Sequence, residues 1–136
     1  MNRILGIDYG ERRVGLAISD PLNIFAKPFS TIDRKSSPDY VQDLLKIIEE
    51  NGVKEIVVGL PLNMKGVDSK QTTIVRNFVQ DLKSKTNYPI YFQDERLSSK
   101  TAEQSLILQK KSPSKNKASI DSTAASLILQ EYLDSK

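Results

Sequence analysis

Three acidic residues stand where an acid is unfavourable unless something binds it. Asp8 ends an apolar run at residues 4–7 that is typical of a buried strand, and Glu95 closely follows a strand-like segment at 88–92. Asp121 shares a helical stripe with apolar residues near the end of the chain. A buried carboxylate is costly unless it is paired or holds a metal ion. Carboxylate oxygens are the ligands that Mg²⁺ prefers, together with substrate phosphates. The three acids therefore form a candidate site for a hard divalent cation.

The residue types that are missing narrow the possible chemistry. The sequence contains no histidine and no cysteine. Serine or cysteine nucleophiles activated by histidine are therefore excluded, as are the imidazole and thiolate ligands of zinc. Any catalysis must use carboxylates, lysine, arginine, hydroxyl groups or bound hard cations.

Each acid taken alone also has a purely structural explanation. Asp8 can belong to a turn, Asp121 can favour a helix N-terminus, and Glu95 can pair with Arg96. For each acid considered alone, the structural explanation is favoured over a metal site. The convergence of three acids at one place favours the cation site instead. Asp94 is expected to be a structural neighbour of Glu95 rather than a ligand.

The strands and helices that must position these acids can be predicted from the sequence. The order is three strands, then helix and strand in alternation, then terminal helices. This predicts an α/β fold with a mixed five-stranded sheet flanked by helices. The expected strands cover residues 3–8, 13–19, 24–32, 53–60 and 88–92. The expected helices cover about 38–50, a segment around 74–82, about 98–110 and about 119–133.

The topology brings the acids to one edge of the sheet. Ligands of such sheets bind beyond the carboxyl ends of the parallel strands. Asp8 ends the first strand, Glu95 follows the last, and the segment "GLPLN" leaves the strand at 53–60. Asp121 is 4, 7 and 11 positions before Ala125, Ile128 and Tyr132, so we expect it to face the sheet.

Length and composition predict one domain over residues 1–136, large enough to bury a core without disulfides. No apolar run approaches the roughly 18 residues of a membrane helix, and no secretory signal is recognisable at the N-terminus. The lack of cysteine fits a reducing compartment, so a cytoplasmic location is expected.

Basic residues cluster in one stretch, although the net charge is only +3. The segment 109–117 carries four lysines and no acid. It is either a solvated loop or a loop that binds phosphates. Tyr9 either stacks on a base or sugar or fills the space beneath the first turn. The four lysines are Lys110, Lys111, Lys115 and Lys117.

Four separated segments carry a family resemblance over nearly the whole chain. "GIDYGERRVGLAISD", "VVGLPLNMKG", "DERLSS" and "IDSTAASLILQEYL" resemble the YqgF (RuvX) family, which has a ribonuclease H-like fold. The resemblance implies a nuclease whose acidic triad is Asp8, Glu95 and Asp121. Two Mg²⁺ or Mn²⁺ ions bridged by Asp8 would serve as cofactors.

The same resemblance implies the surroundings and the substrate of the site. Arg13 and Arg96 would contact phosphate or orient the acids, and "GLPLN", with Asn63, would lie beside the site as part of the nucleic-acid surface. The family's substrates are divided between precursor 16S ribosomal RNA and Holliday junctions. We expect the RNA and a monomer, because no long apolar surface stripe is left after the core helices are assigned. A symmetric resolvase would need a dimer.

Two other classes remain open. "DYGERRVG" also resembles the first phosphate loop of actin-like and sugar-kinase ATPases, but those enzymes need two such domains and a second glycine-rich loop. A non-catalytic RNA- or ribosome-binding module would retain the acids without cutting. Cleavage that depends on added Mn²⁺ distinguishes it from a nuclease.

Overall fold

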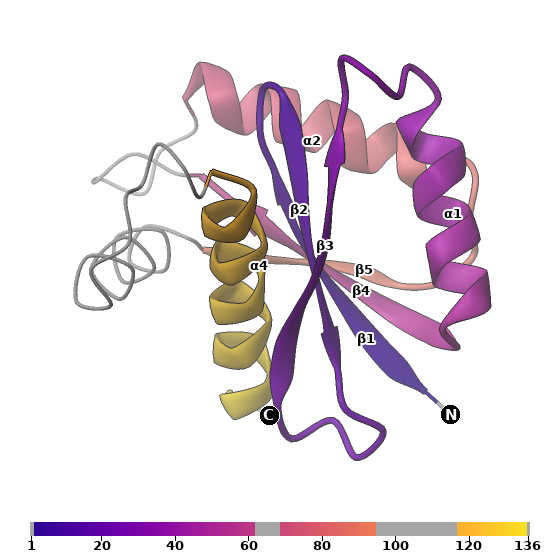
Figure 1. Ribbon diagram of the computed structural model, residues 1–136, viewed down its shortest axis with the longest axis vertical. Helices are drawn as coiled ribbons and strands as arrows, with labels where there is room; N and C mark the ends of the chain where they lie inside the picture. The colour runs from indigo at the N-terminus through magenta and orange to yellow at the C-terminus, as the bar shows by residue number, and fades with distance from the viewer. Residues whose placement is uncertain (1, 62–68, 95–116, 136) are drawn as a thin grey trace.

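A five-stranded mixed sheet forms the centre of the computed structural model, which describes residues 2–61, 69–94 and 117–135 (Figure 1). The strand order is β3-β2-β1-β4-β5. β1 pairs antiparallel with β2 and parallel with β4, so the mixed sheet expected from the sequence is confirmed. The strands are β1 (Arg3–Tyr9), β2 (Arg13–Ser19), β3 (Ala26–Asp33), β4 (Val53–Leu60) and β5 (Ile90–Asp94).

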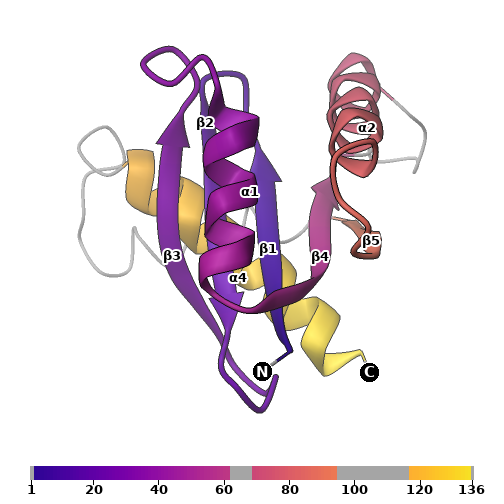
Figure 2. The same ribbon diagram turned by 90° about the vertical axis from the view of Figure 1, so that its right-hand side faces the viewer.

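Helices cover both faces of this sheet, with different residues beneath them. The helices are α1 (Tyr40–Glu50), α2 (Lys70–Lys83) and α4 (Lys117–Asp134). α4 packs on one face, and α1 and α2 pack on the other (Figure 2). Because side chains alternate along a strand, Leu5 and Ile7 enter the core under α1 and α2, whereas Ile4 and Gly6 face α4.

The α4 face is built for close approach. A Cβ at Gly6 would lie 2.8 Å from the Cβ of Leu129 and 3.0 Å from the carbonyl oxygen of Ala125. Ala124 and Ala125 are both buried, as small residues at a tight helix–sheet contact should be. The backbone of α4 therefore rests almost directly on β1.

Local hydrogen bonding explains where the boundaries differ from those expected. β5 begins at Ile90 rather than at residue 88, because Pro89 has no N–H for the ladder and contributes only its carbonyl, which accepts from Ile56 N. α2 begins earlier than the apolar spacing suggested. Ser69 caps it in a reciprocal capping box with Thr72. The helix expected at about 98–110 lies outside the described residues.

The turn between β2 and β3 delays the start of β3 to Ala26. The Asp20 carboxylate accepts the backbone N–H groups of Ile24 (2.7 Å) and Phe25 (2.9 Å), and Asn23 adopts a left-handed φ of 57°. These N–H groups, that of Phe25 above all, lower the pKa of Asp20. The segment 24–25 therefore belongs to the turn.

Apolar side chains gather on the surface of this hairpin. Leu22, Ile24, Phe25 and Phe29 are exposed by 76%, 50%, 63% and 42%. The monomer was expected because no long apolar stripe is left on the helices, whereas this apolar surface lies on a turn and an adjoining strand. In the part of the chain that the structure describes, no helix combines the length and the apolar character needed to cross a bilayer.

Candidate functional site

The first acid of the predicted site lies on the α4 face of the sheet. Asp8 is opposite Gly15 in the antiparallel pairing of β1 and β2, and it continues the alternation of Ile4 and Gly6. Residues that pair in this way place their side chains on the same face. The Asp8 side chain is only partly exposed. It therefore projects toward α4 at the carboxyl end of the central strand.

The second acid reaches the same place from the helix. A Cβ on Gly15 would overlap the carbonyl oxygen of Asp121 and lie 3.0 Å from the Asp121 Cβ. Asp121 therefore sits directly over Gly15, whose strand partner is Asp8. Asp121 is also only partly exposed. Because Gly15 has no side chain, α4 can approach β2 closely enough to bring Asp121 near Asp8.

The third predicted acid, Glu95, lies outside the described residues. Its predecessor Asp94 ends β5 and pairs with Leu60. Asp94 shares the face of Ile90 and Phe92, which pack against the α1 and α2 core, and so it is directed away from α4. This position agrees with its expected role as a structural neighbour.

The two described acids suit a hard cation by their donor chemistry. Both offer carboxylate oxygens from partly buried positions on one face, which are the ligands that Mg²⁺ and Mn²⁺ accept. Within residues 2–61, 69–94 and 117–135, no group of three or more acidic, histidine or cysteine side chains could hold a metal ion. A complete site needs further ligands, such as Glu95 or substrate phosphates.

Tyr9 lies on the opposite face from Asp8, inside the core. Its ring stacks on Phe78 with centroids 4.1 Å apart, and only 6% of the residue is exposed. Its hydroxyl hydrogen-bonds that of Tyr40 at 2.8 Å. This packing agrees with the alternative in which Tyr9 fills the space beneath the first turn, and it leaves no free ring face for a base.

The raised pKa values of two tyrosines predict how the unfolding free energy depends on pH. Burial, followed by the hydrogen bond with Tyr40, raises the pKa of Tyr9, and burial with the bond to Glu55 (2.5 Å) raises that of Tyr132. A raised folded-state pKa favours the neutral phenol. We therefore expect stability that is complete below about pH 10, the ordinary tyrosine pKa, and that falls above it.

Urea unfolding between about pH 9 and pH 11 measures this effect. A Tyr9→Phe, Tyr132→Phe double variant should lose less unfolding free energy over that interval than the parent chain. Equal losses in the two proteins would contradict the assignment.

The predicted phosphate contacts are only partly covered by the structure. Arg13 begins β2 and follows the alternation of Gly15 and Ala17, which places it on the α4 face with Asp8. Lys117 begins α4. The remaining residues of the set, Asn63, Arg96, Lys110, Lys111 and Lys115, lie outside the described residues.

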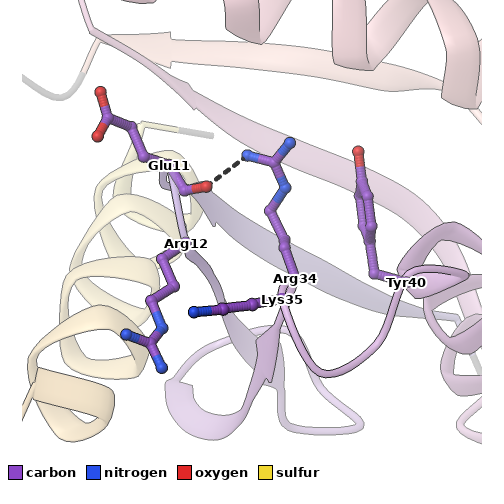
Figure 3. Close-up of a pocket in the computed structure, with 5 residues that line it drawn as sticks. All are labelled: Glu11, Arg12, Arg34, Lys35 and Tyr40. Atoms are coloured by element: carbon purple, nitrogen blue, oxygen red, sulfur yellow. Dashed lines mark hydrogen bonds between the residues drawn. The ribbon is translucent and has the colours of Figure 1, made fainter.

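A second group of cations, not predicted as a site from the sequence, lies across the β1–β2 turn. A hollow of about 550 Å³ is lined by Glu11, Arg12, Arg34, Lys35 and Tyr40 (Figure 3). We call it the basic hollow. Its residues come from two turns and a helix start that are far apart in the sequence. In the sequence, the adjacent pairs Arg12-Arg13 in the first turn and Arg34-Lys35 after the third strand were the signals for it.

Comparison with known proteins gives relatives over nearly the full length. A protein of Roseiflexus sp. (strain RS-1) is 42% identical over 134 residues, which are 98% of this chain and 95% of the relative. A protein of Maridesulfovibrio salexigens is 44% identical over 131 residues, covering 96% and 97% of the two chains. Both are provisionally named pre-16S rRNA nucleases.

Solved structures share the fold at low sequence identity. RuvC of T. thermophilus in complex with a Holliday junction superposes with a TM-score of 0.61 at 14% identity, covering 99% of this chain and 96% of that one. The fowlpox virus resolvase bound to Holliday junction DNA gives 0.61 at 12% identity, covering 98% and 97%. These neighbours confirm the ribonuclease H-like fold.

The family itself is identified by the sequence. The profile of the RuvX family, described as Holliday junction resolvase, matches residues 2–135. Together with relatives above 40% identity, this match confirms the resemblance seen in the four motifs. The chain belongs to the RuvX family.

Proposed function

We propose that the chain is a metal-dependent endonuclease that hydrolyses phosphodiester bonds of structured nucleic acid, in the 5′-end processing of precursor 16S rRNA. The observation that carries the proposal is the meeting of Asp8 and Asp121 over Gly15. The names of the full-length relatives support the RNA substrate. The site offers carboxylates and the chain has no histidine, which fits metal-assisted hydrolysis.

Each residue then has a definite task. Asp8 and Asp121 would hold the cation from the strand and the helix, with Glu95 as the third acid. When bound, Mg²⁺ or Mn²⁺ lowers the pKa of a water and stabilises the charge of the leaving oxygen. Arg13, which lies on the same face, would neutralise a phosphate beside the acids. The rigid pairing of β1 with β2 fixes Asp8 relative to Gly15 before substrate arrives.

A second candidate function is resolution of Holliday junctions. The family description and the two junction-bound structural neighbours support it. Symmetric resolution needs two sites related by a two-fold axis, hence a dimer. The exposed apolar hairpin offers a surface for such a dimer, whereas the RNA proposal requires only a monomer.

One comparison of substrates tests the proposal. We expect cleavage of a precursor 16S rRNA fragment with Mg²⁺ or Mn²⁺, none in excess chelator, and little cleavage of a four-way DNA junction. Sedimentation at micromolar concentration should show a monomer. A stable dimer that nicks junctions in symmetric pairs would favour the resolvase. Binding of either substrate without cleavage under any divalent cation would leave a binding module, and cleavage in excess chelator would contradict the metal.

A further inference from the structure

We propose that the basic hollow binds a backbone phosphate of the nucleic acid, as a second contact point outside the acidic site. The inference rests on the proposed function for the identity of its ligand. Three of the five lining side chains are cations: Arg12, Arg34 and Lys35. In Figure 3 the Glu11 carboxylate points away from Arg12 and Lys35, and the Arg34 guanidinium lies beside the Glu11 carbonyl oxygen.

Arg34 is fixed in place as the inner wall of the hollow. Its Nη1 donates to the carbonyl oxygens of Gly10 (3.0 Å) and Glu11 (2.8 Å) in the β1–β2 turn. Its guanidinium carbon lies 4.7 Å from the ring centroid of Tyr9 and 5.2 Å from that of Tyr40. A guanidinium held by two hydrogen bonds and two aromatic rings has already lost the side-chain freedom that phosphate binding would otherwise cost.

The same side chain carries an unsatisfied donor. Arg34 Nε is buried and has no hydrogen-bond partner among the residues that the structure describes. Buried donors are rarely left without a partner in folded proteins, so the two carbonyl bonds and the aromatic contacts do not satisfy this guanidinium completely.

The outer wall is more adaptable. Arg12 is 58% exposed and lies 3.5 Å from the Asp33 carboxylate through its Nε. The Asp33 carboxylate also accepts the backbone N–H of Lys35 (2.9 Å), and this bond, followed by Arg12, lowers its pKa. Asp33 therefore remains charged and orients Arg12, while the exposed ends of Arg12 and Lys35 are accessible to a phosphate.

The hollow lies within reach of a strand that occupies the acidic site. Glu11 is three residues from Asp8, and three residues span at most about 11 Å. Each strand of duplex DNA carries one phosphate for about every 3.4 Å of helix axis, so the two places are only a few nucleotides apart. A strand cut at Asp8 and Asp121 would then pass over the β1–β2 turn to the hollow.

Fluorescence anisotropy in excess chelator tests the inference without cleavage. The probes are a precursor 16S rRNA fragment and a four-way DNA junction, titrated over a range of salt concentrations. An Arg12→Gln, Lys35→Gln variant should bind both probes about tenfold more weakly, because phosphate contacts carry no sequence information. Its log affinity should depend on log salt with a slope smaller by about two.

The control removes the same charge elsewhere. Lys46 and Lys85 are exposed and each is paired with an acid of its own helix region, Glu50 at 3.9 Å and Asp81 at 3.1 Å. A Lys46→Gln, Lys85→Gln variant should keep its affinity within about twofold. Equal weakening of the two double variants would overturn the inference. If only the hollow variant binds weakly and the parent chain, assayed separately with Mg²⁺ or Mn²⁺, cuts neither probe, the proposed function fails and the inference stands.

Discussion

Asp8→Asn is expected to abolish cleavage while leaving the chain folded. The substitution keeps the shape of the side chain and removes its charge, and the loss of a ligand should lower the rate by at least about 100-fold. Asp8 and Asp121 are neighbours of like charge over Gly15. Relief of their repulsion should leave the unfolding free energy in chelator unchanged or raise it by about 1 kcal/mol.

A structural Asp8 would behave in the opposite way. If its carboxylate served only to satisfy backbone amides, Asn would be tolerated and Asp8→Ala would cost about 0.5–2 kcal/mol, as a lost cap does. Cleavage would then fall only in step with folding. Denaturant unfolding in chelator, with cleavage assayed at matched folded concentration, distinguishes the two. Clear destabilisation with cleavage retained would contradict the catalytic assignment.

Among the glycines of the described sheet, Gly15 is expected to be the one at which substitution by alanine destabilises the fold most. The added Cβ would overlap the Asp121 carbonyl oxygen, and that atom is helix backbone that cannot rotate away. α4 would have to move off β2. We expect a loss of about 3 kcal/mol of unfolding free energy and loss of cleavage per folded molecule, because Asp121 leaves Asp8.

Gly52→Ala provides the matched control. Gly52 has a φ of 67° between α1 and β4, so alanine there is strained by about 1 kcal/mol without approaching either acid. This variant should be less stable and yet cut normally per folded molecule. Urea unfolding and cleavage measured on both glycine variants give the comparison. Normal cleavage per folded molecule by Gly15→Ala would mean that Asp121 is not needed.

The fold could be predicted because its signals are local. Alternating and helical apolar periods gave all five strands and the helices at 40–50, 70–83 and 117–134, with errors of a few residues at their ends. Those errors arose where one side chain decides the boundary, as Ser69 does for α2 and Asp20 for β3.

The contacts around the site could be predicted less well from the sequence than the fold. The stripe of Asp121 could be read from helical spacing, but its contact with Gly15 depends on the register of β1 with β2. The basic hollow joins Arg12 and Arg34 only because β3 returns beside β2. The exposed hairpin was overlooked because a turn has no period from which a buried face could be inferred.

Paramagnetic broadening of amide NMR signals by Mn²⁺ tests the central claim most directly, because it locates the cation on the chain. Mn²⁺ titrated into the parent protein should first broaden the signals of Asp8, Gly15 and Asp121, and an Asp8→Asn, Asp121→Asn variant should lose that broadening. Signals that broaden first elsewhere, or equally in the double variant, would contradict an acidic site built by a strand and a helix over Gly15.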